Sequence, residues 1–241
     1  MHLRTNKWQG KSLSLEILKS QAGLSQGFWV EYDDKAILVD AGDGILSEIV
    51  KRKLPFKSLS AILITHGHFD HMAGLYAILA FFRMIGREKP LYIISPDGSK
   101  EIMAHFKLFT ELYKKTIPFE IIPKNTDDRD GIDIGELHIK AYALYHCGSI
   151  EGGRILDRIP ANGYRIEYLG EQIAISGDTG YVPALEELVK DTQLAIIEAT
   201  FKDEDKVTDE MLQKVHLNEK LAHKAGELAE NYILCHKILH R

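Results

Sequence analysis

Residues 65–71 read THGHFDH and directly follow an apolar run, AILI, at residues 61–64. A short apolar run of this kind is typical of a buried strand, and Asp70 is a residue type that favours the start of a helix. Four of the seven side chains are imidazole or carboxylate donors, which suit zinc and similar divalent ions. Gly67 permits a tight turn between strand and helix. The stretch therefore predicts a turn that presents metal ligands.

The spacing of these donors predicts that their side chains point in two directions. His66 and His68 alternate to one side, whereas Asp70 and His71 begin the predicted helix and can face a second ion. A chance cluster of surface histidines is the alternative interpretation, but H-x-H-x-D-H is far more specific than H-x-H.

Three further donors follow predicted strands in the same way. His146 ends the predicted strand 137–145, Asp178 follows the strand 172–176, and His236 follows the strand 232–235. Each of them alone is more often a capping or solvated polar residue. Together with the first cluster, they are predicted to be metal ligands.

The pattern along the chain predicts an α/β fold. Predicted strands in the first half lie at 12–18, 28–32, 36–39, 61–64 and 91–94, with helices at 71–83 and 100–115. The second half adds strands at 137–145, 163–168, 172–176, 194–197 and 232–235, with a helix at 218–230. Residues 124–131 and 146–163 are predicted loops. Two strand-rich halves that each carry helices predict two sheets packed face to face, with helices outside.

The composition excludes several classes of protein. Of the 241 residues, 45% are hydrophobic and 27% charged, which excludes disorder and fibrous repeats. The net charge of -5 disfavours a polybasic nucleic-acid binder. Two cysteines cannot form a disulfide framework, so a cytoplasmic protein is expected. The longest apolar stretch, 72–82, is too short to span a bilayer, so no membrane partner is expected.

The full donor series resembles the ligand set of the metallo-β-lactamase superfamily, over most of the chain from Asp40 to His236. The segments GYRIE at 163–167, SGDT at 176–179 and EATF at 198–201, with His216, are similar to the phosphodiesterase branch typified by ribonuclease Z. The resemblance implies a four-layer αβ/βα sandwich of two mixed β-sheets flanked by helices, with residues 1–241 as a single domain.

The resemblance also implies how metal is held. It implies two Zn²⁺ ions per chain, with Mn²⁺ or Fe as the alternatives. By the resemblance, Asp178 bridges the ions, and Asp40 orients the ligand loop by hydrogen bonding. The other six implied ligands divide into two groups, one for each ion: His66, His68 and His146, and then Asp70, His71 and His236.

The implied activity is hydrolysis of phosphodiester bonds by a metal-bridging hydroxide. Asp70 would position the attacking water, and His216, held by Glu198, would protonate the leaving group. A solvated loop histidine and a capping or surface acid are the alternatives for these two residues. The tripeptide His216-Leu217-Asn218 also differs from the His-Ser-Thr usual in the family.

The substrate is less defined. Ribonuclease Z carries a long Gly/Pro-rich arm for tRNA after the GYRI strand, whereas here only the residues at 169–171 separate the two strands. The expected substrate is therefore a phosphodiester, either a small molecule or RNA. A tRNA would need another docking surface, and a homodimer stays open. Candidate basic contacts, for which a solvated helix face is the alternative, are 51–53, Lys214, Lys220, Lys224, Lys237 and Arg241.

Two rival functions remain at this point. One is a hydrolase of esters, lactones or thioesters built on the same fold. The other is a non-catalytic binding member, which an intact ligand set disfavours because clustered charges without metal destabilise a protein.

Overall fold

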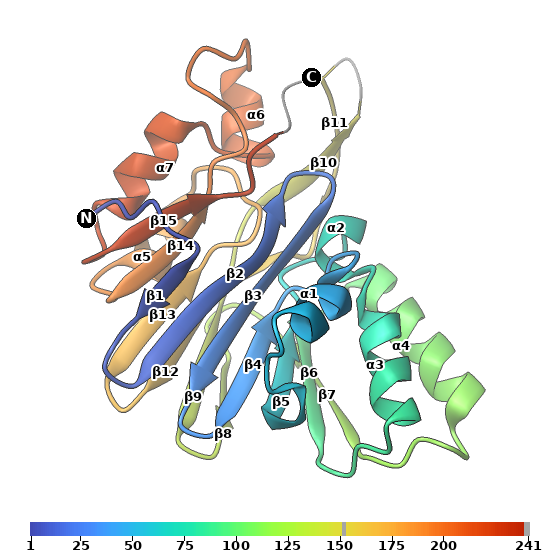
Figure 1. Cartoon of the computed structure of the whole chain (residues 1–241). Helices are drawn as coiled ribbons and strands as arrows, with labels where there is room; N and C mark the ends of the chain where they lie inside the picture. The colour runs from blue at the N-terminus through green and yellow to red at the C-terminus, as the bar shows by residue number, and fades with distance from the viewer. Residues whose placement is uncertain (151–152, 239–241) are drawn as a thin grey trace.

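Two β-sheets packed face to face form the centre of the molecule, and helices cover their outer faces (Figure 1). The computed structural model describes residues 1–150 and 153–238. The first sheet has seven strands in sequence order: β1 (Lys7–Gln9), β2 (Leu13–Gln21), β3 (Ser25–Tyr32), β4 (Lys35–Val39), β5 (Leu59–Leu63), β6 (Leu91–Pro96) and β7 (Ile121–Thr126).

Strands β1 to β4 pair antiparallel, whereas β4 to β7 pair parallel. Parallel strands need crossover connections, and helices supply them here. These helices cover the outer face of the first sheet with side chains such as Ile45, Phe82 and Phe109. The crossover helices are α1 (Ile45–Lys51), a 3₁₀ turn (Phe56–Ser58), α2 (Phe69–Met72), α3 (Leu75–Met84) and α4 (Lys100–Tyr113).

The second sheet has the strand order β15-β14-β13-β12-β9-β8. Its strands are β8 (Gly131–Ile134), β9 (Leu137–Ala143), β12 (Asn162–Tyr168), β13 (Glu171–Ile175), β14 (Leu194–Glu198) and β15 (Tyr232–Cys235). The helices of this half are α5 (Pro183–Val189), α6 (Asp209–Lys214) and α7 (Glu219–Gly226). Both sheets mix parallel and antiparallel pairs, which confirms the predicted αβ/βα sandwich.

The core lies between the sheets. Phe28, Val39 and Leu63 of the first sheet pack in one cluster with Tyr164 and Ile196 of the second, all fully buried. The alternation of buried and partly buried residues along β2 places its apolar side chains on this inner face. Burial of this apolar surface fixes the register of the strands in both sheets. It therefore also fixes where the ends of the strands lie.

The predicted helix 71–83 is wrong in its bounds, because the chain forms two helices, α2 and α3, with Gly74 at the junction. A Cβ atom on Gly74 would lie 2.4 Å from the carbonyl oxygen of Gly42. The Gly74 N–H donates to the carbonyl of Ala41 at 2.7 Å. Helix α3 therefore starts where the backbone touches the strand-end loop that also carries Asp40.

The two predicted loops are also wrong in part. Residues 124–126 end strand β7, and most of 146–163 forms a hairpin of β10 (His146–Ile150) and β11 (Arg154–Ile159), a two-stranded sheet of its own. Every residue of β11 is exposed or only partly buried, so the usual alternation of apolar and polar residues is missing there. In Figure 1 the hairpin extends beyond the sandwich at the end opposite the β8–β9 turn.

Strands β12 and β13 join through a two-residue turn. Leu169 and Gly170 both have positive φ, 50° and 80°, as a tight hairpin turn requires. Tyr168 pairs directly with Glu171, whose carboxylate accepts hydrogen bonds from the N–H groups of Lys11, Ser12 and Leu13. This turn is therefore clamped onto the first sheet, at the place where the family resemblance would put an arm.

In the part of the chain that the structure describes, no helix is long and apolar enough to cross a membrane. Arg241, one of the predicted basic contacts, lies outside the described residues.

Candidate metal centre

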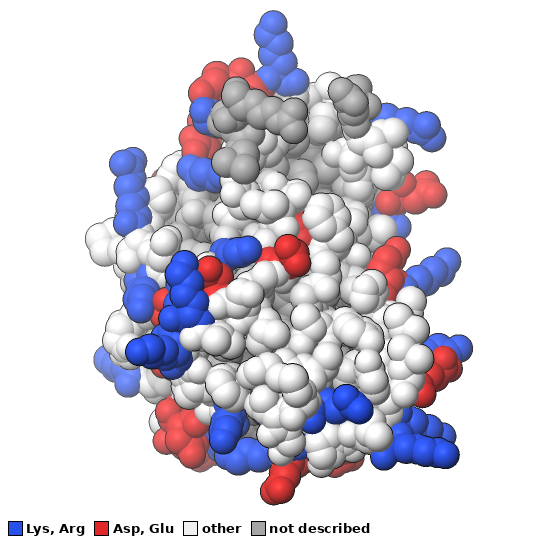
Figure 2. All heavy atoms as spheres, turned by 45° about the vertical axis from the view of Figure 1, so that its right-hand side comes forward, with Lys and Arg blue, Asp and Glu red and all other residues white. Residues whose placement is uncertain are grey.

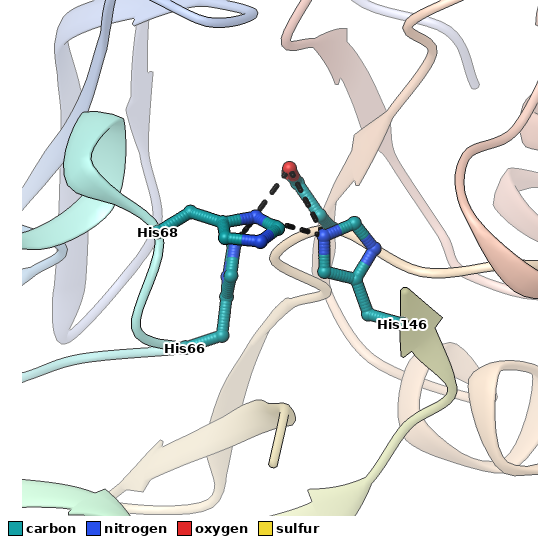
Figure 3. Close-up of side chains that lie close together, drawn as sticks. His66, His68 and His146 are labelled. Carbon is teal, nitrogen blue, oxygen red and sulfur yellow. Dashed lines mark hydrogen bonds and ion pairs between the residues drawn. The ribbon is translucent and has the colours of Figure 1, made fainter. Parts of the chain in front are cut away.

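The seven predicted ligands come together at one end of the sandwich, although they span residues 66 to 236. His66 follows β5, His146 begins β10 directly after β9, Asp178 follows β13 and His236 follows β15. Figure 3 shows the rings of His66, His68 and His146 directed toward one another. All seven side chains are buried except that of His68, which is partly buried.

The first donor group contains three imidazoles and Asp178. His68 Nδ1 lies 3.0 Å from His66 Nε2 and 3.1 Å from His146 Nε2. Asp178 Oδ2 lies 3.8 Å from His66 Nε2 and 4.0 Å from His146 Nε2. Two ligands of one tetrahedral zinc are ~3.3 Å apart when each Zn–N bond is ~2.0–2.1 Å. These four side chains therefore fit the ligand set of one divalent ion.

The second donor group consists of Asp70, His71 and His236. Asp70 Oδ2 lies 3.3 Å from His236 Nε2 and 3.7 Å from His71 Nε2. Asp178 Oδ2 is 3.3 Å from His71 Nε2, so the oxygen that borders the first group also borders this one. The geometry places Asp178 between two donor groups.

The charges of these groups suit metal binding. Burial lowers the pKa of His66 and of His146 well below the usual value, so both rings are neutral and keep a lone pair for a cation. Burial opposes ionisation of Asp178, but His236 and His71 lower the pKa of its carboxyl group well below the usual range. Burial likewise opposes protonation of His71, yet the Asp178 and Asp40 carboxylates raise the pKa of His71 well above normal.

Two buried atoms among the described residues lack a hydrogen-bond partner at the centre of this cluster: His71 Nε2 and Asp178 Oδ1. Asp178 Oδ1 lies 3.2 Å from His236 Nδ1 but is not aligned with it for a hydrogen bond. Buried polar atoms are normally satisfied, and unsatisfied ones that face a shared point fit the ligands of a cation. The donors are nitrogen and oxygen atoms, the set expected for zinc and similar ions.

Asp40 holds the ligand loop from behind. Its Oδ1 accepts a hydrogen bond from the N–H of Thr65 at 2.8 Å, and its Oδ2 lies 2.8 Å from His71 Nδ1. This contact fixes the His71 ring with Nε2 toward the donor groups. Asp40 has a φ of 59°, a left-handed conformation that Asp and Asn tolerate better than other side chains. On the other side, His146 Nδ1 donates to the carbonyl of Val215 at 2.8 Å.

Replacing Asp40 with asparagine is expected to lower divalent-metal affinity ~10- to 100-fold, because Asn preserves the shape and the left-handed backbone but removes the negative charge from His71. Titration of metal-free protein with Zn²⁺ in a competing chelator measures this affinity. Asp43→Asn, an exposed substitution in the same loop, is the control. Unchanged affinity in Asp40→Asn would contradict the orienting role.

Glu198 and His216, predicted as a pair, do lie together. The buried Glu198 Oε1 accepts from the Thr179 N–H at 2.9 Å and lies 3.0 Å from His216 Nδ1. Thr200, which the sequence analysis missed, links this pair to the metal ligands. Its hydroxyl donates to Glu198 Oε2 at 2.7 Å and lies 3.0 Å from His236 Nδ1. Thr200 sits two residues beyond Glu198, and that spacing is the only signal that could have indicated it.

The departure at 216–218 from the family tripeptide has a structural explanation. Leu217 is fully buried among apolar side chains. The Asn218 side chain caps α7 by accepting a hydrogen bond from the Leu221 N–H at 3.0 Å, and Asn and Thr are both good capping residues. With Leu217 and Asn218 in these places, His216 still lies 3.0 Å from Glu198.

His216 has the properties of an acid. Burial opposes its charge, but the Glu198 carboxylate raises the pKa of His216 to about 9. With Nδ1 turned to Glu198, the Nε2 atom of His216 remains available to donate a proton. His216 also forms a donor group with Asp178 and His236, so its position alone is compatible with ligation as well.

An open cavity of about 360 Å³ gives access to the cluster. Its polar lining includes His68, Asp70, His146 and Asp178 from the donor groups, together with His216. The apolar side chains in the lining are those of Ala22, Phe69, Leu156, Phe201 and Ile238.

Among the residues that the structure describes, none of the predicted basic contacts lines this cavity. Lys214 pairs with Glu210 and Lys237 with Glu219. Figure 2 shows Lys and Arg side chains spread around the margin of one face, several of them beside acidic ones. Ion pairs also engage Lys51, Arg52 and Lys224.

Comparison with known proteins identifies the family. The family profile described as the beta-lactamase superfamily domain matches residues 35–236. The chain therefore belongs to the beta-lactamase superfamily. Ribonuclease Z of Borrelia duttonii is 31% identical over 248 aligned positions, covering 84% of this chain and 76% of that protein. Ribonuclease Z of Borrelia hermsii is 30% identical, with the same coverage. The protein is thus a metal-dependent hydrolase similar to ribonuclease Z.

Solved structures support the fold assignment. The short form of human tRNase Z superimposes with a TM-score of 0.77 at 22% identity, covering 93% of each chain. The metallo-beta-lactamase fold protein YhfI from Bacillus subtilis gives a TM-score of 0.75 at 19% identity, covering 96% of this chain and 88% of that one.

Proposed function

We propose that the protein hydrolyses phosphodiester bonds with two divalent metal ions, zinc in the first instance, bound at the site described above. The observation that carries the proposal is the position of Asp178 between two His/Asp donor groups, with Glu198 and His216 beside them. Bound there, two such ions would lower the pKa of a water molecule and offset the negative charge of a phosphodiester.

The chain's own residues would perform the remaining steps. Asp70 Oδ2 accepts a hydrogen bond from the Gly23 N–H at 2.8 Å, which holds this carboxylate at the cavity wall, where it can orient the attacking water. His216 donates a proton from Nε2 to the leaving oxygen. Glu198 is held by Thr179 and Thr200, and it keeps His216 in the orientation that this transfer needs.

The relatives named ribonuclease Z support RNA as the substrate class. The two-residue turn between β12 and β13 supports a substrate held close to the cavity, a short or single-stranded segment rather than the elbow of a tRNA. Cytoplasmic location, a homodimer and processing of tRNA stay predictions.

The test combines metal analysis with a panel of chromogenic substrates. Purified protein supplied with Zn²⁺ or Mn²⁺ should bind close to two ions per chain and cleave bis(p-nitrophenyl) phosphate and short RNA. A chromogenic lactam and a thioester should be left intact. Folded protein that binds no metal, or that cleaves only the thioester, would overturn the proposal. Binding of RNA that falls steeply with salt would show that the protein contacts phosphates.

A further inference from the structure

The mouth of the metal-site cavity carries exposed apolar side chains that the hydrolysis of a phosphodiester does not need. Phe69 is 61% exposed, although it stands between the partly buried His68 and the buried Asp70, one from each donor group. Leu156 of the β10–β11 hairpin is 41% exposed, and Ile238 is 39% exposed. All three line the cavity. Single exposed apolar residues are common on protein surfaces, but three at one catalytic opening indicate a ligand with an uncharged part.

The cavity limits what that part can be. Its volume of about 360 Å³ lies near the lower end of the ~300–1,000 Å³ range of small-ligand pockets, which suits one nucleotide unit. A phosphate held between the donor groups would bring its attached group to the adjacent residue, Phe69. A sugar is too polar to favour this rim, whereas a nucleobase is flat, uncharged and stacks on aromatic rings.

We infer that Phe69 is a stacking platform for the nucleobase next to the scissile phosphate, with Leu156 as a second apolar side chain of the same cavity. This inference rests on the proposed phosphodiesterase function. It assigns specificity for single-stranded nucleotide substrates, because a base must be unpaired to lie flat against Phe69. The fold supports the assignment, since Phe69 is the first residue of α2 and its backbone is fixed by the neighbouring buried residues.

Two substrates with one leaving group isolate the contribution of the base. The first is the p-nitrophenyl ester of thymidine 5′-monophosphate, and the second is methyl p-nitrophenyl phosphate. Both release p-nitrophenolate, so the ratio of their kcat/KM values reports only on the nucleoside. We expect Phe69→Ala to lower this ratio roughly 5- to 100-fold. Phe69→Tyr, which keeps the ring, should retain most of it, and Leu156→Ala should lower it by less.

Leu112→Ala on α4 is the matched control, because Leu112 is also 61% exposed but lies outside the cavity lining. This variant should keep the wild-type ratio. An unchanged ratio in Phe69→Ala, or an equal loss in Phe69→Tyr, would overturn the stacking role while phosphodiester hydrolysis stands. Failure of the metal-loaded wild-type protein to cleave either ester would instead overturn the proposed function, and the stacking role with it.

Discussion

Replacing Asp178 with alanine is expected to reduce bound metal well below two ions per chain and kcat/KM for a phosphodiester by about 10³-fold or more. The reason is its shared position: Asp178 Oδ2 lies within 4.0 Å of His66, His71 and His146. Removal of this carboxylate takes one donor from each group and removes the negative charge nearest to His66 and His146.

Metal content by atomic spectroscopy and steady-state rates with excess Zn²⁺ measure the two effects. Asp97→Ala is the matched control, because Asp97 likewise follows a strand, β6 of the first sheet, but is exposed and outside the donor groups. That variant should keep both its metal and its activity. Wild-type turnover in Asp178→Ala would refute the bridging role, and a fold check by circular dichroism would separate loss of metal from unfolding.

Replacing His216 with alanine is expected to lower kcat by ~10²- to 10⁴-fold for a substrate with an alkoxide leaving group, such as a dinucleotide. The loss should be much smaller for a p-nitrophenyl ester, because p-nitrophenolate leaves without a proton. Glu198→Gln should show the same dependence on the leaving group in weaker form, since Glu198 lies 3.0 Å from His216 Nδ1 and orients the ring.

Comparison of the two leaving groups in each variant decides whether His216 acts as a general acid or as a metal ligand. If His216 is a general acid, His216→Ala should keep the wild-type metal content. Loss of metal, or an equal loss of rate with both leaving groups, would instead make His216 a ligand alongside Asp178 and His236. His138→Ala is the control, because His138 is on β9 at the end remote from the site and pairs with Asp133.

The donors could be predicted from sequence because their pattern is local and chemically specific. Four of the seven lie within 66–71, and the other three each follow an apolar strand. The apolar runs also predicted the two sheets, since burial of one face sets both strand and register. The resemblance to a known family contributed the division of the donors into two groups.

Features that depend on contacts across the fold could not be predicted. The break between α2 and α3 at Gly74 arises from the nearby backbone of Gly42, more than thirty positions away. Thr200 joins Glu198 to His236 only because β14 and β15 lie side by side. Strand β11 has no buried face, so its residues carry no periodic signal.

The position of His236 directly after the last strand has a consequence for biosynthesis. A ribosome adds ~5–20 residues per second, so roughly 10–30 s separate the emergence of residue 71 from that of residue 236. During this interval the nascent chain presents the 66–71 donors without their partners from the second sheet. The donor group that contains His236 must therefore await the pairing of β15 with β14, whereas His66, His68, His146 and Asp178 all emerge earlier, so the last donor group is completed only at the end of synthesis.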